Sequence, residues 1–322
     1  MERRTTRYQK RRELKKVPKS CVDPGRFGVS FSLKQCRDLK INQADTLHFL
    51  LHDMGFRRFR LMSYWNEHEK NQGDYDFTAL DAQIALIEKH GGVITMCLGV
   101  RQPRWPENHW PDWALELNET ERFKALSAYI RTVVKRYVSY SSIISWQLEN
   151  EALNRGFGIN GNFNRARFRS EYQLVRKLDP KRMIIMSTSN TYGIPLRQPR
   201  PNLFGFTLYG VQYQNGTYSY SKIPPWWYPL RAHIIKIITA RKSFIHELQA
   251  EPWGPKAIWE MSIEEQDKSM DLAQLEKNIR TAKKTNLYPI DLWGGEWWYW
   301  RYLKNDRQLS SRIIQFIKET DQ

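Results

Sequence analysis

Short apolar segments alternate along the chain with longer segments in which apolar residues recur at helical spacing. The short segments predict strands and the longer ones predict helices, with Asn42 placed to cap the first helix. The predicted strands cover residues 26–33, 58–62, 93–98, 143–148, 183–187, 203–208, 243–245 and 289–292. The predicted helices cover residues 42–54, 77–90, 119–137, 166–178, 229–240, 263–285 and 309–318.

Eight predicted strands that alternate with helices favour a parallel (β/α)8 barrel, a TIM barrel, over an open doubly wound sheet. No glycine-rich turn follows the first predicted strand, as a dinucleotide-binding sheet would require. In such a barrel, the residues that directly follow the strands gather at one rim, where active sites form. The length of 322 residues, 41% of them hydrophobic, suits a single barrel domain at residues 21–322.

The first twenty residues differ from the rest of the chain in charge. They contain nine Lys and Arg against two Glu, which is +7 of the formal net charge of +17. Residues 1–20 are therefore predicted to be a flexible basic arm that has no specific nucleic-acid partner, although it could contact anionic surfaces. No apolar stretch suggests a signal peptide or a membrane span, so the localisation expected by default is cytoplasmic.

The cysteines and histidines do not predict a metal site. Cys21, Cys36 and Cys97 are an odd number with no paired spacing, which argues against both a disulfide framework and a zinc site. His48 and His52 share a helical face but have no acidic ligand near them. We therefore expect no cofactor.

Two segments, residues 146–151 (WQLENE) and 244–251 (FIHELQAE), each place a glutamate at the end of an apolar run. Hydrolysis of a glycosidic bond needs two carboxyl groups, one to protonate the leaving oxygen and one to attack the sugar or activate water. A barrel would bring Glu151 and Glu247 to the same cleft from about the fourth and seventh strands.

Two nearby glutamates, Glu149 and Glu251, are alternative candidates for these two catalytic roles. Alternation along an extended strand places Glu149 on the same side as Glu151. Glu251 rivals Glu247, but a proline follows it, so it is expected in a loop beyond the strand, where it could bind a sugar hydroxyl. The same alternation predicts that His246 points away from Glu247, into the barrel wall.

Tryptophan is concentrated in three predicted rim loops, residues 101–113, 223–228 and 293–302, which hold nine of the thirteen tryptophans. Aromatic faces stack on the C–H faces of sugar rings, so this cluster suits a carbohydrate cleft. Large aromatic residues also dominate ordinary cores, and about half of these tryptophans are expected only to fill the interior.

At these residues the chain resembles the retaining glycoside hydrolases of clan A, (β/α)8 enzymes that include the family 42 and family 35 β-galactosidases and the family 5 cellulases. Residues 146–151 resemble the fourth-strand Asn-Glu signature, and residues 244–247 resemble the seventh-strand segment that ends in the nucleophile. Residues 64–81, which contain WNEHE, GDYDF and LD, resemble a family 42 segment, and Arg60 matches a clan arginine. The whole pattern is most similar to an uncharacterised bacterial group within the clan.

The resemblance implies a double-displacement reaction on a β-type glycosidic bond, with Glu151 as acid/base and Glu247 as nucleophile. Glu151 would need a raised pKa, and Arg60 would keep Glu247 ionised. The nucleophile segment lacks the aromatic-Gly tail of family 5, and the metal cysteines of family 42 have no counterpart. Neither family therefore supplies the substrate.

Other residues at the predicted rim are candidates for holding the sugar. Asn150 suits a hydrogen bond to the 2-hydroxyl, although an Asn at this position is also a common turn residue. Tyr209 could orient the nucleophile, Trp293 is the best candidate for a platform beneath the sugar, and Glu296 could bind hydroxyls or pair with Arg301. The predicted substrate-binding residues are Arg60, Trp65, Trp105, Asn150, Tyr209, Glu251, Trp293, Glu296 and Trp298.

The sequence thus predicts a retaining glycoside hydrolase, for which the net charge favours an anionic glycan only weakly. A transglycosylase would use the same residues and differ only in the acceptor. A barrel that has lost its chemistry and binds carbohydrate or nucleic acid is the alternative from another class, because a fold alone does not establish a function.

Overall fold

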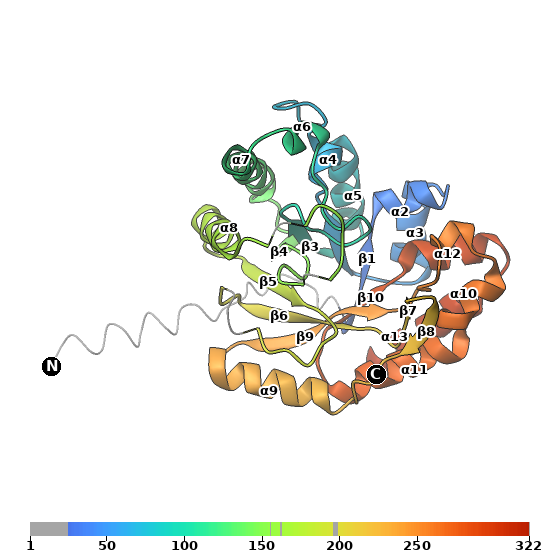
Figure 1. Ribbon diagram of the computed structural model, residues 1–322. Coiled ribbons are helices and arrows are strands. Elements are labelled where there is room, and N and C mark those ends of the chain that lie inside the picture. The colour runs from blue at the N-terminus through green and yellow to red at the C-terminus, as the bar shows by residue number, and fades with distance from the viewer. Residues whose placement is uncertain (1–24, 155, 162, 196–198, 322) are drawn as a thin grey trace.

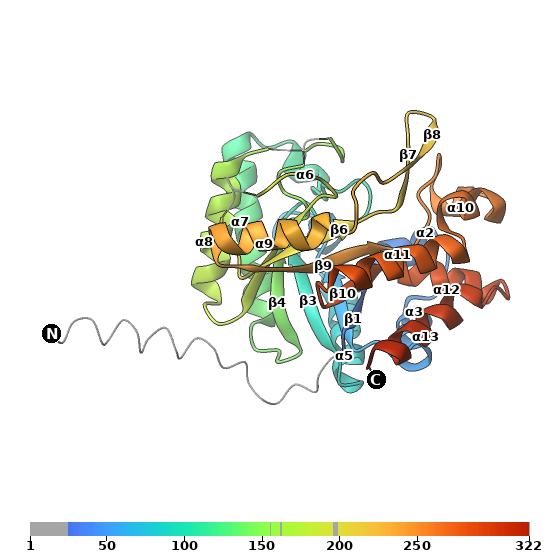
Figure 2. The same cartoon turned by 90° about the horizontal axis from the view of Figure 1, so that it is seen from below.

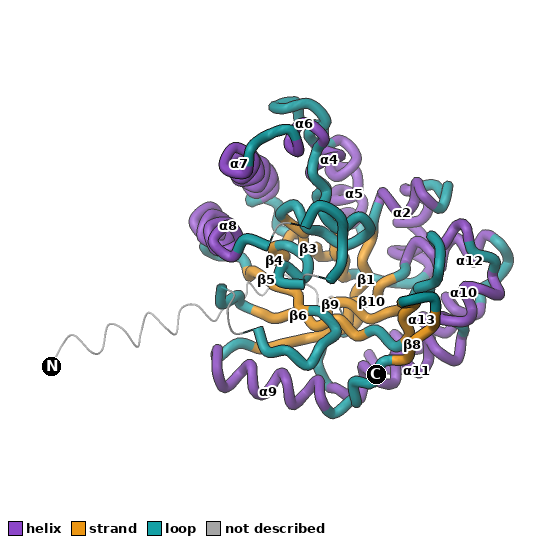
Figure 3. The backbone as a smooth tube through the Cα atoms, viewed as in Figure 1, coloured by secondary structure: helices purple, strands orange, loops and turns teal. Residues whose placement is uncertain are grey.

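The computed structural model describes residues 25–154, 156–161, 163–195 and 199–321, and the predicted basic arm lies outside them. Eight parallel strands close into a barrel in the order β1-β10-β9-β6-β5-β4-β3-β2. Helices surround this barrel (Figures 1 and 3). The predicted (β/α)8 fold is confirmed. The barrel strands are β1 (Phe27–Phe31), β2 (Arg58–Met62), β3 (Val93–Leu98), β4 (Ile143–Leu148), β5 (Met183–Thr188), β6 (Leu203–Leu208), β9 (Lys242–Gln249) and β10 (Ile290–Trp293).

The longer helices follow the predicted pattern with one correction. The predicted helix at residues 263–285 is two helices, because Asp271 interrupts it and caps the second one by accepting a hydrogen bond from the Gln274 N–H. Asn42 caps its helix as expected, and that helix continues as a π-helix at Phe49–Asp53. The longer helices are α3 (Gln43–His48), α5 (Thr78–Lys89), α7 (Glu119–Tyr137), α8 (Arg165–Leu178), α9 (Trp227–Thr239), α10 (Ile263–Met270), α11 (Leu272–Thr285) and α13 (Gln308–Asp321).

Several short elements at the rim were not predicted. The hairpin of β7 (Val211–Gln214) and β8 (Thr217–Tyr220) projects beyond the barrel (Figure 2). The segment expected as a tryptophan-rich loop after the last strand is instead helix α12 (Gly295–Leu303). The others are α2 (Leu33–Asp38), α4 (Trp65–His68), α6 (Asp112–Leu115) and a 3-10 turn at Ile258–Glu260.

One continuous apolar core lies between the barrel and its helices. Helix α5 contributes Leu80, Ile84 and Ile87, which are fully buried and recur at the spacing of one helical face. Packing of this kind holds the strands in position, and it therefore also holds the residues at the strand ends in position. Within the described residues, none of the helices is long and apolar enough to cross a membrane.

Candidate active site

A cleft with a volume of about 1300 Å³ lies at the carboxyl ends of the barrel strands. It is lined by residues that lie at or after the carboxyl ends of β1, β3, β4, β5, β6, β9 and β10, which are far apart in the sequence. The predicted residues that reach it are Trp105, Asn150, Glu151, Tyr209, Glu247, Glu251 and Trp293. The barrel thus brings together both predicted catalytic carboxyl groups and most of the predicted binding residues.

Glu247 is held by hydrogen bonds to both of its carboxylate oxygens. Arg60 Nη1 donates to Glu247 Oε2 at 2.6 Å, and the Tyr209 hydroxyl donates to Glu247 Oε1 at 2.6 Å. Glu247 is 7% exposed and Arg60 1% exposed, so this ion pair is shielded from water. Two strong donors, one of them charged, stabilise the ionised carboxylate and fix its orientation.

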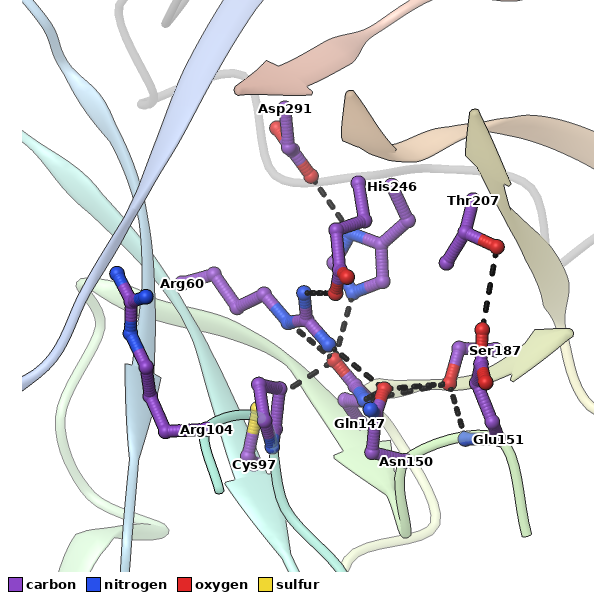
Figure 4. Close-up of polar contacts among 12 residues, drawn as sticks. Arg60, Cys97, Arg104, Gln147, Asn150, Glu151, Ser187, Thr207, His246 and Asp291 are labelled. Carbon is purple, nitrogen blue, oxygen red and sulfur yellow. Dashed lines mark hydrogen bonds and ion pairs between the residues drawn. The ribbon is translucent and has the colours of Figure 1, made fainter. Parts of the chain in front are cut away.

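Arg60 is itself held in place from the wall of the barrel. Its Nε donates to Gln147 Oε1 at 2.6 Å, and its Nη2 donates to Asn150 Oδ1 at 3.0 Å. Figure 4 shows Arg60 at the centre of this network. The guanidinium therefore links the strand that carries Glu247 to the strand end that carries Asn150.

Glu151 lies in a different environment. Its carboxylate accepts hydrogen bonds from the Thr207 hydroxyl at 3.1 Å and from Asn154 Nδ2 at 2.9 Å, and its backbone N–H donates to Ser187 Oγ at 2.8 Å. Among the residues that the structure describes, none forms an ion pair with the Glu151 carboxylate. Burial, and after it the charge of Glu247, raise the pKa of Glu151. A carboxyl group in this setting favours the protonated form.

Glu149 does not share the cleft with Glu151. Its carboxylate accepts hydrogen bonds from the N–H groups of Val100 and Arg101, and it pairs with Arg167. The expected alternation fails because the chain has left the extended conformation here, with φ of 53° at Glu149 and 44° at Glu151. Of these two glutamates, Glu151 lines the cleft and Glu149 does not.

The Asn150 amide is held at both ends. Its Oδ1 accepts hydrogen bonds from Arg60 and from Ser187 Oγ at 3.0 Å, and its Nδ2 donates to Glu107 Oε2 at 3.1 Å. Asn150 lines the cleft, so an amide N–H is close to where a sugar would bind. This rigid setting distinguishes Asn150 from an ordinary turn residue.

Glu107 is a further carboxyl group in the cleft, besides Glu151, Glu247 and Glu251, and the sequence did not single it out as a site residue. It is 5% exposed and follows β3 in an irregular loop with φ of 70°. Burial raises the pKa of Glu107 to about 8, and the charges of Glu247 and Glu151 act in the same direction. At neutral pH this side chain is therefore mainly a neutral acid. Glu107 lies in no periodic segment, which explains why the sequence pattern missed it.

We expect Glu107→Gln to remove a pH dependence of stability. Between the ordinary pKa of about 4.5 and the folded pKa of about 8, the unfolded chain releases this proton and the folded chain keeps it. The wild type should therefore lose stability relative to Glu107→Gln by up to about 1.4 kcal/mol per pH unit in that interval. Urea unfolding at a series of pH values measures the difference. Exposed Glu116→Gln is the matched control, and a slope equal to that of the control would contradict the account.

Trp293 and Arg104 form one wall of the cleft. The Arg104 guanidinium lies 4.0 Å from the centre of the Trp293 ring and pairs with both Glu251 and Glu296. Glu251 lines the cleft as expected, whereas Glu296 is fully buried behind Arg104. Glu296 is therefore not placed to bind a sugar, and its partner is Arg104 rather than Arg301, which pairs with two aspartates, Asp267 and Asp306.

Trp65 and Trp298 are core residues, contrary to the prediction. Both are fully buried. Trp65 stacks on Tyr129 with 5.5 Å between ring centres, and Trp298 lies against Phe56 with 6.1 Å between ring centres. The Trp298 indole N–H donates to the Ala250 carbonyl at 2.6 Å. A tryptophan-rich segment cannot show from sequence which rings face the core. Trp105, by contrast, is 55% exposed and lines the cleft.

The prediction for His246 is also wrong. Its ring contacts Gln147 and Asp291 inside the barrel rather than pointing away from the site (Figure 4). Strand β9 has an irregularity at this point, because Phe206 is paired with Ile245 and the next residue, Thr207, with Glu247. His246 is the extra residue, so simple alternation of sides breaks down.

The cleft also contains aromatic residues that were not predicted as site residues. Trp253 lies 5.5 Å from Tyr209 and 5.6 Å from Phe157, measured between ring centres, and all three line the cleft. Trp253 directly follows the Glu-Pro pair after β9, and its position in a loop gave no periodic signal. In the part of the chain that the structure describes, no group of three or more His, Cys, Asp or Glu residues is arranged to hold a metal ion.

Comparisons with known proteins agree with this fold. Residues 23–240 match the family described as cellulase (glycosyl hydrolase family 5). That match covers about two thirds of the chain and includes Glu151 but ends before Glu247. Mannan endo-1,4-beta-mannosidase A of Podospora anserina is 33% identical over 105 residues, which are 33% of this chain and 24% of that protein. The chain thus aligns with about a quarter of that relative.

Two solved structures share the architecture. An exo-beta-1,4-mannosidase from Opitutaceae bacterium strain TAV5 superposes with a TM-score of 0.59 at 14% identity, over 95% of this chain and 62% of that one. A GH5_18 protein from Bifidobacterium longum subsp. longum, in complex with Manb1-4GlcNAc, gives a TM-score of 0.61 at 10% identity, over 91% and 78% of the two chains. These identities support a common fold only. From the family match over more than half of its length, the chain belongs to glycosyl hydrolase family 5, within the clan that its motifs resemble.

Proposed function

We propose that the protein is a retaining glycoside hydrolase in which Glu247 is the nucleophile and Glu151 is the acid/base. The observation that carries the proposal is the contrast between the two carboxyl groups in one cleft. Glu247 accepts hydrogen bonds from Arg60 and Tyr209, which favours the ionised form. Burial and the Glu247 charge raise the pKa of Glu151. Retaining and inverting mechanisms both need one ionised and one protonated carboxyl group, and the resemblance of both segments to retaining clan A enzymes favours Glu247 as the nucleophile.

In the first step, Glu247 attacks the anomeric carbon while Glu151 gives its proton to the departing glycosidic oxygen. This step forms a glycosyl ester on Glu247 and releases the aglycone as an alcohol. The charge on Glu247 is lost, and with it one cause of the raised pKa of Glu151. Glu151, now ionised, can take a proton from water, which attacks the same carbon and frees Glu247. The two steps together give a product of unchanged anomeric configuration.

We propose β-linked, mannose-containing glycans as the substrate class. The support comes from the printed names of a mannan endo-1,4-beta-mannosidase and an exo-beta-1,4-mannosidase among the similar proteins. The cleft volume of about 1300 Å³ exceeds the roughly 300–1,000 Å³ of typical small-ligand sites, so more than one sugar ring fits. Trp293 and Trp105 supply aromatic surface along it.

The experiment is to incubate the protein with β-1,4-mannan oligosaccharides and with a panel of aryl β-glycosides, and to follow the products by proton NMR. We expect cleavage of β-mannosides with the β-anomer formed first. Oligosaccharides longer than the substrate would indicate transfer to a sugar acceptor instead of water. First formation of the α-anomer would contradict the retaining mechanism, and cleavage of another β-glycoside alone would contradict the substrate class.

Removing the hydroxyl of Tyr209 should slow the reaction without preventing folding. A hydrogen bond to a charged group contributes about 1.5–3 kcal/mol, so Tyr209→Phe should lower kcat by about 10- to 100-fold. The loss should appear in kcat more than in KM, because the hydroxyl donates to Glu247, the group that attacks the sugar. Steady-state kinetics test this expectation. Tyr192→Phe, at an exposed tyrosine outside the cleft, should behave as the wild type.

Removing the exposed ring of Trp105 should weaken substrate binding. Aromatic stacking of this kind is worth about 0.5–1.5 kcal/mol beyond area burial, so Trp105→Ala should raise KM for an oligosaccharide by about tenfold or less. Activity on a small aryl glycoside should change little. Trp226→Ala is the matched control, because Trp226 is 63% exposed but does not line the cleft. Equal effects of the two substitutions would exclude a specific role for Trp105.

A further inference from the structure

Beneath Glu247, a chain of buried polar side chains crosses the barrel interior and is not used in the proposed chemistry. Asp291 on β10, His246 on β9 and Gln147 on β4 are at most 3% exposed. His246 Nδ1 lies 2.6 Å from Asp291 Oδ2, and His246 Nε2 lies 2.8 Å from Gln147 Oε1. Figure 4 shows the imidazole between these two groups. An oxygen therefore faces each ring nitrogen.

The Gln147 oxygen must face His246, because the neighbours of the amide fix its orientation. Arg60 Nε, which can only donate, lies 2.6 Å from Gln147 Oε1. The amide nitrogen donates to the Glu149 carbonyl at 3.2 Å and to Asn150 Oδ1 at 3.3 Å. Turning the amide over would place an NH2 group against Arg60 and an oxygen against two other acceptors.

A neutral imidazole cannot satisfy both contacts. It has one N–H donor and one nitrogen lone pair. The unprotonated nitrogen would therefore face an oxygen that is also an acceptor, at less than 3 Å and with no hydrogen between them. The missing proton would otherwise have to lie on Asp291, but the Arg58 cation already faces this side chain, with its Nε 3.4 Å from the other Asp291 oxygen. An imidazolium has an N–H donor at each ring nitrogen, so it can donate to Asp291 and to Gln147 together.

We propose that His246 is an imidazolium that donates to Asp291 and Gln147 together, and that it acts as a positioning residue for Arg60 and Glu247. Gln147 Oε1 is the shared acceptor of His246 and Arg60, so His246 limits where the guanidinium can lie. Arg60 in turn holds Glu247.

Charged and titratable groups surround the ring and act in opposite directions. Burial, and after it the Arg60 charge, lower the pKa of His246 below its ordinary value, although the hydrogen bond and charge of Asp291 and the charge of Glu247 act in the opposite direction. The Cys97 thiol also reaches Gln147 Oε1, at 3.3 Å. The hydrogen-bond geometry opposes this balance, because an acceptor faces each ring nitrogen and Glu247 compensates the Arg60 charge at 2.6 Å.

The backbone around His246 is built to admit its ring. Gly205 on β6 lies so close that an added Cβ would be 2.6 Å from the Cβ of His246 and 2.9 Å from the ring. Together with the irregularity of β9 at this residue, this contact holds the imidazole inside the barrel. Its position is therefore fixed by the fold and is independent of the charge assignment.

Nitrogen NMR of the full chain labelled with 15N-histidine tests the protonation state without any substrate. We expect both ring nitrogens of His246 to carry protons at pH 7, with the signals identified by their disappearance in His246→Gln. Asp291→Asn should remove the proton from Nδ1 and leave the Nε2–H, because the introduced amide can donate to Nδ1. One unprotonated ring nitrogen in the wild type would overturn the proposal.

The positioning role has a separate readout in Arg60. We expect the Arg60 Nε–H to exchange with solvent at least about tenfold faster in His246→Gln than in the wild type. The reason is that Gln147 Oε1, which accepts from Arg60 Nε, is no longer held by the His246 ring. Exposed His233→Gln is the control. An unchanged exchange rate would overturn the positioning role.

The kinetic arm alone rests on the proposed function. There, His246→Gln should lower kcat/KM about tenfold, since Glu247 is held less firmly. If the wild type is inactive on every glycoside, the proposed function fails while the two NMR measurements still decide this inference.

Discussion

Glycine in place of Glu247 should lower kcat by about 10⁴-fold or more, because the reaction loses the group that forms the covalent intermediate. Glu247 contacts Arg60 and Tyr209 and lines the cleft, so the substitution leaves a space at the reacting centre with its donors intact. Azide can enter that space and attack the anomeric carbon directly. We therefore expect azide to restore activity and to yield a glycosyl azide of inverted configuration.

Two controls make this expectation specific. Glu151→Gly leaves the nucleophile in place, so azide should intercept the glycosyl ester and give an azide product of retained configuration. Glu251→Gln alters a second carboxylate that lines the cleft, and it should show no azide rescue because Glu251 is paired with Arg104. Wild-type rates in Glu247→Gly would refute the assignment of the nucleophile.

Loss of the Arg60 guanidinium should have the largest effect on stability. Arg60→Met leaves Glu247 as a buried carboxylate without its cation and removes one hydrogen-bond donor each from Gln147 Oε1 and Asn150 Oδ1. Breaking a buried pair in this way costs about 3–5 kcal/mol. We expect a decrease of this size in the free energy of unfolding, measured with urea at pH 7, together with loss of activity.

A double variant separates the uncompensated charge from lost packing. Adding Glu247→Gln to Arg60→Met removes the buried charge and should recover part of the lost stability, though no activity. Arg136→Met is the matched control, since Arg136 pairs with Asp81 at the surface, where such pairs contribute about 1 kcal/mol or less. Equal destabilisation by Arg60→Met and Arg136→Met would mean that the Arg60 network does not have the burial described here.

Much of the fold could be predicted because barrel strands are short, mainly apolar segments that alternate with helical patterns. Strands β2, β3, β4 and β6 begin and end where the pattern placed them. Strand β9 was predicted too short because its second half, from His246 to Gln249, carries polar side chains into the site. A strand is therefore hardest to recognise where it supplies the chemistry.

The candidate site was predicted less completely, for three physical reasons. The irregularity at His246 and the positive φ of Glu149 break the alternation on which sidedness arguments depend. Trp65 and Trp298 are buried by contacts between distant segments, which composition does not reveal. Glu107 acquires its raised pKa from tertiary burial, since the loop around it has no periodic pattern.

The most direct test of the central claim is to trap the covalent intermediate. The wild type would be treated with an activated 2-deoxy-2-fluoro β-mannoside, digested with pepsin and analysed by mass spectrometry. If the product analysis identifies another β-glycoside as the substrate, the corresponding 2-deoxy-2-fluoro glycoside would be used instead. The account predicts a single sugar adduct on the peptide that contains Glu247. An adduct on Glu151 or Glu251, or turnover that inverts the anomeric centre without any adduct, would contradict it.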